Sequence, residues 1–569
     1  MQRRVFLQSI VVLSLQATAA ATLPGCRRSR DATPRPELGA SFPQGVASAD
    51  PTSDSVVLWT RALPQQGDPE SFSLYLELAE DEAFASLILQ EVVLAKATQD
   101  FTVHARISGL QADRVYYYRF VSGQGDQSVT GRTWTAPEAE ALQPVKLAFV
   151  SCQERKHGYY GAWRRMLLDD VVAPAEEQIR FVLHLGDFIY ETDEAWQDPL
   201  DAFRQPIPGG LIEASGTPRD PGTFPDGGTS ASGVRYARTL ADYRHLYRRY
   251  LSDPDLLAAR ARWPFVCIWD DHEFSDDCWQ SEANYDDDGA NASTNEPSQQ
   301  RKVAANQAWS EYIPVDYQSD DSELPHHAHD FRFAEVANTP NDKPNDDNSA
   351  AIETLVIYRR LQFGRMVDLL LTDNRSWRSD HAVPEDISGG GGVFIHPRAV
   401  MPLDLLNTLD AGSEANDGRP PAFLGVGGLL FENPRRHRPP GSILGERQKA
   451  WWKTAMAQSS SRWRLWGNSV PLLRFKVNLD ALNALLPGVV VSSDSWDGYA
   501  HERRELMQYL LTQKIRNVVS LSGDVHAHFS GLVMDDYDAA QPQPAAVEVV
   551  SAAISSLSMF DGVEQLSRR

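Results

Sequence analysis

Five short segments of this chain combine the side chains that bind metal ions in proteins: carboxylate, thiol, phenol, imidazole and carboxamide. Each segment directly follows an apolar run with the length and composition of a buried β-strand. Ligands of α/β proteins gather beyond the carboxyl ends of strands, so five such endings in one chain predict a shared metal site. The segments are Ser151-Cys152-Gln153, Gly186-Asp187-Phe188-Ile189-Tyr190-Glu191, Asp270-Asp271-His272-Glu273, Gly467-Asn468-Ser469 and Gly523-Asp524-Val525-His526-Ala527-His528.

The strands that must position these segments alternate with helical stretches from Pro144 onward. Residues 236–251 and 446–458 have the clearest helical pattern. Strands that are apolar on both faces and separated by helices indicate an α/β core. Three polar, acidic stretches, at roughly 192–233, 280–298 and 318–350, are typical of surface loops. The expected strands are 145–150, 179–185, 265–269, 367–371, 464–466 and 517–521.

A different pattern precedes this core, between residues 41 and 136. Short runs rich in β-branched and aromatic residues recur there at a spacing of about ten residues, which predicts an antiparallel β-sandwich. Leu110 and Tyr116 resemble the corner of fibronectin type III domains, in which a tyrosine hydroxyl hydrogen-bonds back to the chain. The expected strands are 55–61, 72–78, 89–94, 101–107, 115–121 and 129–134.

The composition excludes several classes of protein. Of the 569 residues, 42% are hydrophobic and 23% are charged, which fits neither a disordered chain nor a protein with many membrane spans. The formal net charge of −23 repels polyanions, so we expect no sequence-specific nucleic-acid partner. Four cysteines are too few for a disulfide framework. Cys267 and Cys278 could pair after export, but one lies on an expected strand and the other on a loop, which favours free thiols.

The first 30 residues predict export. Arg3 and Arg4 precede an apolar run through Leu23 that polar residues interrupt, which resembles a twin-arginine signal more than a membrane-spanning helix. Leu23-Pro24-Gly25-Cys26 resembles a lipoprotein cleavage box, with Cys26 as the lipidated residue; the alternative is cleavage nearby and release of a soluble protein. We therefore expect the twin-arginine machinery to export the protein to the periplasm, the cell surface or the medium.

Further motifs accompany the five segments: Gly45-Val46-Ala47-Ser48-Ala49-Asp50-Pro51, Leu58-Trp59-Thr60-Arg61, Leu371-Thr372-Asp373-Asn374-Arg375 and the stretch from Gln448 to Asn468. With them the chain resembles the binuclear metallophosphoesterases and, among these, the PhoD-type alkaline phosphatases. The resemblance covers nearly the whole sequence. It implies a four-layer αββα sandwich over residues 145–569. A small fibronectin type III-like β-sandwich domain would precede it at 41–136, after the signal at 1–30.

The resemblance also implies two sets of metal ligands. Asp187 would bridge both metals. Cys152, Tyr190 and His526 would complete the first site, whose thiolate, phenolate and imidazole suit Fe³⁺. The second site would add only oxygen ligands, which favours Ca²⁺, with Mg²⁺ or Mn²⁺ next. Its further ligands would be Asp271, Asn468 and Asp524.

The mechanism that the resemblance implies is in-line attack on phosphorus by a hydroxide that bridges the two metals. His272 would donate a proton to the leaving oxygen or hydrogen-bond the phosphoryl group, although a purely structural histidine is the alternative. Arg375 and Arg378 could hold phosphate with a guanidinium fork, or form structural salt bridges. Arg155 has the same two interpretations.

The sequence thus predicts an exported, metal-dependent alkaline phosphatase that hydrolyses phosphomonoesters, phosphodiesters or both and scavenges phosphate. One alternative keeps the fold and shifts the substrate towards phospholipids or teichoic acids. Another is a cell-surface binding module with a structural metal site, but such sites are closed, whereas these ligands lie at strand ends.

Some features depart from the expected pattern or carry less information. Asp276 and Asp277 follow the Asp-Asp-His-Glu motif where similar sequences have asparagines, so their charge could hold a further cation or disfavour anionic substrates. The chain ends soon after the strand near 546–551, which predicts a more open pocket or a poorly folded protein. We interpret Asp286-Asp287-Asp288-Gly289 and the tract of His326, His327 and His329 as exposed loops.

Overall fold

The computed structural model describes residues 35–156, 158–192, 222–230, 233–283, 296–316, 331, 333–339, 346–383, 399–426, 429–478, 488–556 and 558–559. Residues 35–569 form one compact unit. The signal segment with Cys26, the acidic stretch 286–288 and the histidine tract lie outside the described residues. Within the described part of the chain, no helix is long and apolar enough to cross a membrane.

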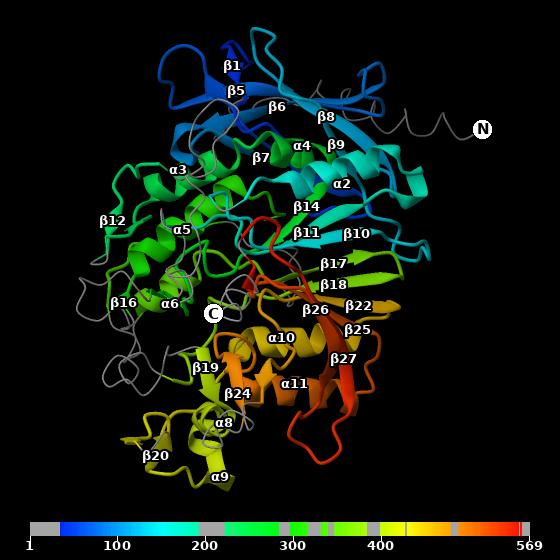
Figure 1. Cartoon of the computed structure of the whole chain (residues 1–569). Helices are drawn as coiled ribbons and strands as arrows, with labels where there is room; N and C mark the ends of the chain where they lie inside the picture. Colours follow the sequence, from blue (N-terminus) through cyan, green and yellow to red (C-terminus); the bar gives the residue numbers. More distant parts are fainter. Residues whose placement is uncertain are drawn as a thin grey trace, which may run out of the picture. The chain divides into compact units, whose positions relative to one another are not determined.

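Two six-stranded sheets form the centre of this unit (Figure 1). The order of the first is β10-β11-β14-β2-β3-β7 and that of the second is β17-β18-β22-β25-β27-β26. Parallel strands occupy the middle of the second sheet, and antiparallel β17 and β26 form its edges. The bounds in the first sheet are β10 Leu147–Val150, β11 Phe181–Leu185, β14 Pro264–Ile268, β2 Val46–Ala49, β3 Ser55–Arg61 and β7 Thr102–Ser108. Those in the second are β17 Arg359–Phe363, β18 Val367–Leu371, β22 Trp463–Gly467, β25 Val518–Ser522, β27 Pro544–Val550 and β26 Phe529–Met534.

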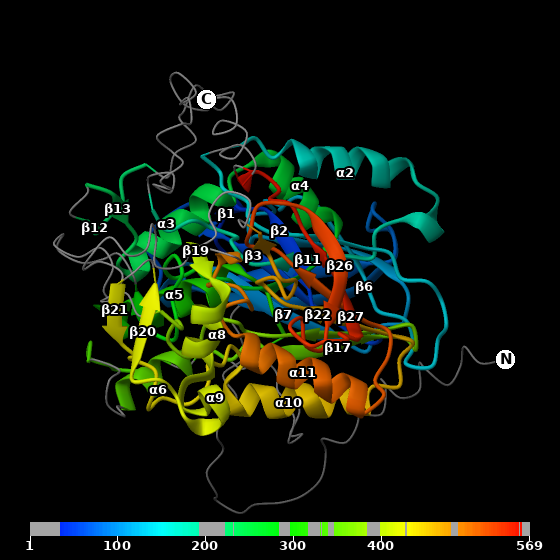
Figure 2. The same ribbon diagram turned by 60° about the horizontal axis from the view of Figure 1, so that its bottom comes forward.

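Helices cover the outer faces of the two stacked sheets, as Figures 1 and 2 both show. Helices α2 (Gly161–Val172) and α4 (Pro254–Arg262) lie beside the first sheet, and α10 (Gly445–Gln458) and α11 (Ala500–Thr512) beside the second. Helices α3 (Leu240–Tyr250) and α5 (Gln299–Tyr312) pack at one end of the sheets. The predicted α/β core is therefore confirmed, and its layers run helix, sheet, sheet, helix.

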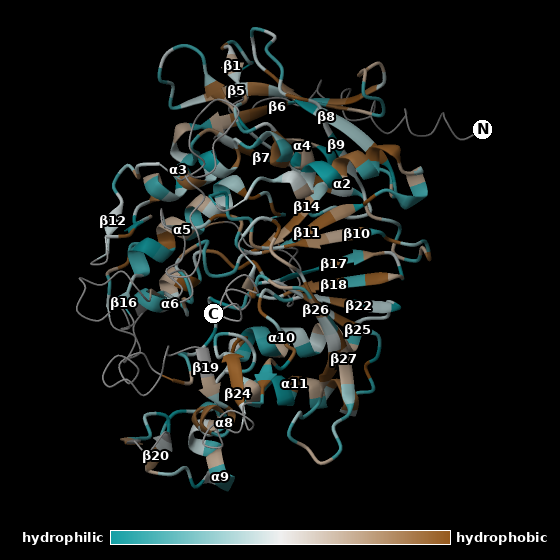
Figure 3. Ribbon diagram, in the orientation of Figure 1, coloured by the Kyte–Doolittle hydropathy of each residue, from teal (hydrophilic) through white to brown (hydrophobic). Residues whose placement is uncertain are grey.

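Apolar side chains of both sheets meet in a shared core. Phe181 of β11 stacks on Phe363 of β17 with ring centroids 4.4 Å apart. A second core lies between the second sheet and its helices, where the rings of Trp452 and Trp466 are 4.7 Å apart. Figure 3 shows the corresponding concentration of hydrophobic residues in the stacked strands. Burial of this apolar area is the main driving force that holds the sheets face to face.

The N-terminal strands are divided between two sheets: four form a separate sheet, and three belong to the first central sheet. A four-stranded sheet has the order β6-β5-β8-β9, with bounds Leu87–Lys96, Ser71–Ala79, Val115–Val121 and Gly131–Trp134. The facing strands β2, β3 and β7 instead continue the first central sheet, because β2 pairs in parallel with β14 through Ser48 and Pro264. The likeness to a fibronectin type III domain and the boundary between 41–136 and 145–569 stay predictions.

Local sequence signals explain where several elements begin and turn. The hydroxyl oxygen of Tyr116 accepts a hydrogen bond from the backbone N–H of Gln111 at 2.9 Å, so the predicted tyrosine corner is present. Helix α3 starts at Leu240, four residues later than predicted, because Thr239 and Asp242 form a capping box. A small group of elements that lies between β18 and α10 in the sequence was not predicted: β19 Ala399–Pro402, α8 Leu403–Ala411, β20 Phe423–Val426 and β21 Leu429–Glu432.

A buried ion pair ties the start of the chain to the second sheet. The Nη2 atom of Arg359, in β17, lies 2.8 Å from Oδ1 of Asp50, which follows β2, and both side chains are 0% exposed. Arg359 also donates to the carbonyl oxygens of Cys267 and Ile357. Removal of one partner of such a pair leaves the other charge buried and uncompensated.

We therefore expect Asp50→Asn to lower the free energy of unfolding by about 3–5 kcal/mol. Urea unfolding followed by tryptophan fluorescence measures the change. Asp54→Asn is the matched control, because Asp54 is exposed in the same loop and should alter stability by less than about 0.5 kcal/mol. Equal stabilities of the two variants would show that the Asp50–Arg359 pair does not hold the two parts together.

Candidate metal centre

The five predicted segments meet at one end of the two sheets. Cys152 follows β10, Asp187 and Tyr190 follow β11, and Asp271 and His272 follow β14. Because β10, β11 and β14 are parallel neighbours, their carboxyl ends lie at the same edge. The second sheet brings the other segments from β22 and β25, which are also parallel neighbours. They carry Asn468 after β22, and Asp524 and His526 after β25.

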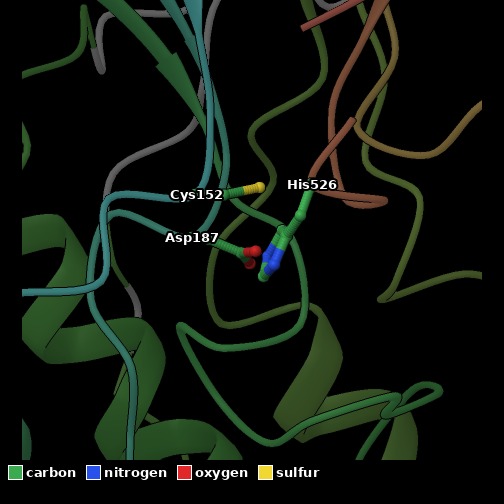
Figure 4. A group of neighbouring side chains, drawn as sticks. All are labelled: Cys152, Asp187 and His526. Carbon is green, nitrogen blue, oxygen red and sulfur yellow. The ribbon is translucent and has the colours of Figure 1, made fainter. Parts of the chain in front are cut away.

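The residues predicted for the first metal lie together. One ligand atom each of Cys152, Asp187 and His526 falls within 4.8 Å of the other two, and Figure 4 shows these three side chains converging. The hydroxyl of Tyr190 lies 3.2 Å from Oδ2 of Asp187 and 3.2 Å from Nε2 of His526. The structure thus gathers a thiol, a carboxylate, a phenol and an imidazole around one point.

A second group, rich in carboxylates, adjoins the first. The ligand atoms of Asp187, Asp271 and His272 lie within 4.8 Å of one another, and so do those of Asp270, Asp271 and Asp524. Asp187 belongs to both groups, which is the position expected of a bridging ligand. Asp270 was not among the predicted ligands, although its place directly before Asp271 in the motif was a signal for it.

Asn468 is buried beside these groups, but the protein engages both ends of its carboxamide. Its Oδ1 atom accepts hydrogen bonds from Nδ2 of Asn374 and, at 3.2 Å, from Nε1 of Trp496. Its Nδ2 atom donates to the carbonyl oxygen of Val470 at 2.6 Å. The role of Asn468 as a ligand stays a prediction.

Strained backbone places four of the side chains. Cys152, Asp187, Asp524 and His526 have φ values of 59°, 55°, 68° and 52°, in the left-handed region that costs a non-glycine residue about 1 kcal/mol or more. Such geometry persists only where neighbours hold it. The carboxylate of Glu273 does so by accepting hydrogen bonds from the backbone N–H groups of Asp187, Phe188 and Asp270.

The site concentrates buried acidic groups. Burial raises the pKa of Asp187 and Asp524 well above the usual range, and Asp270 and Asp271 add like charges that raise them further. Burial, together with Asp187, likewise raises the pKa of the Cys152 thiol and of the Tyr190 phenol. Cations that accept these atoms as ligands would offset this cost, so the donor set fits two metal ions.

Arg375 supplies part of the missing positive charge. Its fully buried guanidinium lies 2.6 Å from Asp270, 3.5 Å from Asp271, 2.8 Å from Asp494 and 3.7 Å from Asp524. These contacts are the structural salt bridges that were one of the two roles expected for Arg375. The other role, direct binding of phosphate, stays a prediction. Arg378, also buried, pairs with Asp494 at 2.9 Å. Sequence reasoning missed Asp494, which no motif marked.

His272 lies between two carboxylates at the border of the cluster. Its Nδ1 atom is 2.7 Å from Oε2 of Glu191, and its Nε2 atom is 3.5 Å from Oδ1 of Asp276. Its ring packs on that of Tyr190 with centroids 4.0 Å apart. Burial alone would lower the pKa of His272, but Glu191, Asp271 and Asp187 raise it well above its usual value. The imidazolium form is therefore favoured and can give up a proton.

Ser556, which follows β27, contacts the first group of candidate ligands. The Oγ atom of Ser556 lies 2.9 Å from the hydroxyl of Tyr190 and 2.9 Å from the carbonyl oxygen of Cys152. It also accepts a hydrogen bond from the backbone N–H of Glu154. The sequence carried no signal for this serine, because 366 residues separate it from Tyr190. Cys267 and Cys278 are buried free thiols, as predicted.

The arrangement is an α/β fold with candidate cation ligands at the carboxyl ends of its strands, and comparison with known families shows which family it belongs to. Residues 147–568 match the PhoD-like phosphatase family, and residues 27–137 match the N-terminal domain of PhoD-like phosphatases. The chain therefore belongs to the PhoD-like phosphatase family and is a phosphoric ester hydrolase.

Individual relatives agree with this assignment. The chain is 28% identical to alkaline phosphatase D of Bacillus subtilis (strain 168) over 523 residues, which cover 90% of this chain and 69% of that protein. A solved structure of PhoD superimposes with a TM-score of 0.61 at 26% identity, covering 90% of this chain and 77% of the other. The predicted resemblance to PhoD-type alkaline phosphatases is thus confirmed.

The raised pKa values predict how stability depends on pH once metals are removed by chelation. Burial raises the pKa of Glu273 to about 7 and raises those of Asp187 and Asp524 well above their usual range, so the folded chain keeps protons that the unfolded chain releases. The free energy of unfolding must then fall as pH rises. His104 and His184, whose pKa burial lowers to about 4 and about 3, oppose this trend only below about pH 6.5.

We therefore expect the chelated protein to melt several degrees lower at about pH 8.5 than at about pH 6.5. Added Ca²⁺ should raise the Tm more at the higher pH, because ligands bind cations when deprotonated. Thermal scans at the two pH values, with and without Ca²⁺, measure both effects. A Tm that rises with pH in the chelated protein would show that the buried carboxylates with raised pKa values do not control its stability in this range.

Proposed function

We propose that this phosphoric ester hydrolase is an exported alkaline phosphatase that cleaves phosphomonoesters, phosphodiesters or both, with Fe³⁺ and Ca²⁺ as its metals. The observation that carries the proposal is the pair of adjoining groups that share Asp187. The group with Cys152, Tyr190 and His526 suits a redox-capable ion such as Fe³⁺. The group with Asp271 and Asp524 offers carboxylate oxygens, which Ca²⁺ prefers, and Mg²⁺ or Mn²⁺ could replace it.

Bound cations would lower the pKa of an attacking water and neutralise charge on the phosphoryl oxygens. The residues of the chain supply the remaining functions. Glu191 holds Nδ1 of His272, which leaves Nε2 to donate a proton to the leaving oxygen. Arg375 neutralises and orients the carboxylates of Asp271 and Asp524. Glu273 keeps the loop of Asp187 in place through the backbone N–H groups of Asp187 and Phe188, and it also accepts from the N–H of Asp270.

The removal of the proton donor should slow turnover. We expect His272→Asn to lower kcat for 4-nitrophenyl phosphate by about 10²- to 10⁴-fold, because asparagine cannot donate a proton of suitable pKa. Steady-state kinetics measure the loss, and the exposed His437, changed to Asn, serves as control.

Metal analysis of the same purified protein tests the cofactors. Iron and calcium near one atom each per chain would support the proposed pair. Full activity after thorough chelation, or unchanged kcat in His272→Asn, would contradict the mechanism.

Export is proposed from the sequence of the first 30 residues, and phosphate scavenging outside the cytoplasm is the use that fits it. We expect Arg3→Lys combined with Arg4→Lys to keep the protein in the cytoplasm, because twin-arginine export needs the arginine pair. Arg27→Lys with Arg28→Lys is the matched control. Fractionation measures the distribution, and normal export of the first variant would exclude this route.

The attachment of the exported protein to a membrane depends on Cys26. Cys26→Ala should move the protein from the membrane fraction to the soluble fraction if Cys26 carries lipid. A protein that is soluble with Cys26 intact indicates cleavage and release instead.

A further inference from the structure

The segment that follows β27, residues 553–556, runs along the loop that carries Cys152. The backbone N–H of Ile554 donates to the carbonyl oxygen of Ser151 at 3.0 Å, and the N–H of Ser556 donates to that of Cys152 at 3.2 Å. These hydrogen bonds join backbone groups, so they fix the path of the segment whatever its side chains are. The segment is thereby held beside the first group of candidate ligands.

The hydroxyl of Ser556 reaches that group directly. Its Oγ atom lies 2.9 Å from the hydroxyl oxygen of Tyr190 and 2.9 Å from the carbonyl oxygen of Cys152. It also accepts a hydrogen bond from the backbone N–H of Glu154 at 3.1 Å. A serine hydroxyl has one proton and two lone pairs. The proton therefore has two possible acceptors, the Tyr190 oxygen and the Cys152 carbonyl oxygen.

The charge of the Tyr190 oxygen decides between these acceptors. A tyrosine that binds a cation does so through its deprotonated oxygen, which can accept hydrogen bonds but cannot donate one. A hydrogen bond to a charged acceptor is about twice as strong as one to a neutral acceptor. The proton of Ser556 must then point at the Tyr190 oxygen whenever this oxygen serves as a ligand.

A closed ring of hydrogen bonds holds Tyr190 from its other side. Its backbone N–H donates to the hydroxyl oxygen of Tyr250 at 3.1 Å, and the Tyr250 hydroxyl donates to Oε1 of Glu154 at 3.0 Å. The N–H of Glu154 donates to Ser556, which completes the ring at the Tyr190 oxygen. The ring fixes the backbone of Tyr190 through Tyr250 and its phenol oxygen through Ser556.

We propose that Ser556 is a positioning residue of the first metal site, whose hydroxyl donates to the Tyr190 oxygen and keeps it directed at the other ligands (Figure 4). The inference rests on the proposed function, since it concerns the Fe³⁺ site of the same enzyme. Asp187 and His526, each 3.2 Å from the Tyr190 oxygen, are themselves candidate ligands, whereas Ser556 contacts it from outside the ligand set. Hydrogen bonds of this outer kind orient ligands and tune the bound metal.

The affinity for iron is the first readout. Ser556→Ala removes the hydroxyl and should weaken Fe³⁺ binding by the full-length protein about 10- to 100-fold, measured by competition with a chelator of known affinity. Ser556→Thr keeps a hydroxyl and should restore most of the affinity. Ser555→Ala is the matched control. The Oγ atom of Ser555 donates to the carbonyl oxygen of Glu154 at 2.9 Å, so this variant loses a hydroxyl of the same segment whose partner is not a ligand.

The second readout follows the Tyr190 oxygen itself. A phenolate bound to Fe³⁺ absorbs visible light by transfer of an electron to the metal, and a hydrogen bond to the phenolate stabilises the electron that is transferred. Loss of this hydrogen bond should therefore move the absorption band to longer wavelength in Ser556→Ala. The band should stay at its wild-type position in Ser556→Thr and in Ser555→Ala.

A double-mutant cycle separates this role from a purely structural one. If Ser556 acts through the Tyr190 oxygen, Ser556→Ala should cost little further iron affinity in a Tyr190→Phe background, where that oxygen is absent. An equal loss in both backgrounds would show that Ser556 only holds the backbone of Cys152 and Glu154, and it would overturn the inference.

The wild type provides a test that does not depend on the folding of Ser556→Ala. Deuterium in place of the hydroxyl proton alters the hydrogen bond, so the resonance Raman frequency of the bound phenolate C–O group should differ between ordinary and heavy water. Identical frequencies overturn the inference.

The same measurements distinguish failure of the inference from failure of the proposed function. A metal-loaded wild type that contains no iron, or shows no charge-transfer band, overturns the proposed iron site and the inference with it. A wild type whose band Ser556→Ala leaves unmoved overturns the inference alone.

Discussion

The concentration of buried negative charge around Asp187 and Asp271 is the constraint on which the rest of the structure depends. Carboxylates that share a buried site repel one another, and burial disfavours their charged forms, as the raised pKa values of Asp187 and Asp524 show. Three groups offset this repulsion: Arg375 lies near Asp271 and Asp524, the positive charge of His272 acts to lower the pKa of Asp187 and Asp271, and the backbone N–H of Asp277 donates to Asp271. These groups do not compensate all of the negative charge of the carboxylates. The remaining negative charge attracts cations, which an enzyme of this family can use.

The fold provides the rigid support that this arrangement needs. Parallel strands of two stacked sheets present the candidate ligands at their carboxyl ends, and both sheets share one apolar core. The N-terminal strands extend the first sheet, and the buried pair of Asp50 and Arg359 joins them to the second. The strained backbone at Cys152, Asp187, Asp524 and His526 persists because so much packing surrounds it.

Residues outside the ligand set give this site its particular chemistry. Glu191 lies 2.7 Å from Nδ1 of His272, Ser556 contacts the Tyr190 hydroxyl, and Asp276 lies 3.5 Å from Nε2 of His272. They come from distant parts of the chain, and the fold places them in contact with His272 or Tyr190.

The sequence alone determined many of the strands, two of the helices and the segments that bear the candidate ligands. Hydrophobic runs and caps act over a few residues, so β3, β8 and β18 have the predicted bounds and Thr239 explains the start of α3. Only the tertiary structure decided that β2 joins the sheet of β14, that Arg375 contacts four carboxylates, and that Ser556 reaches Tyr190. These contacts join segments that lie far apart in the chain. The local pattern of residues does not show which distant residues will pack against one another in the folded protein.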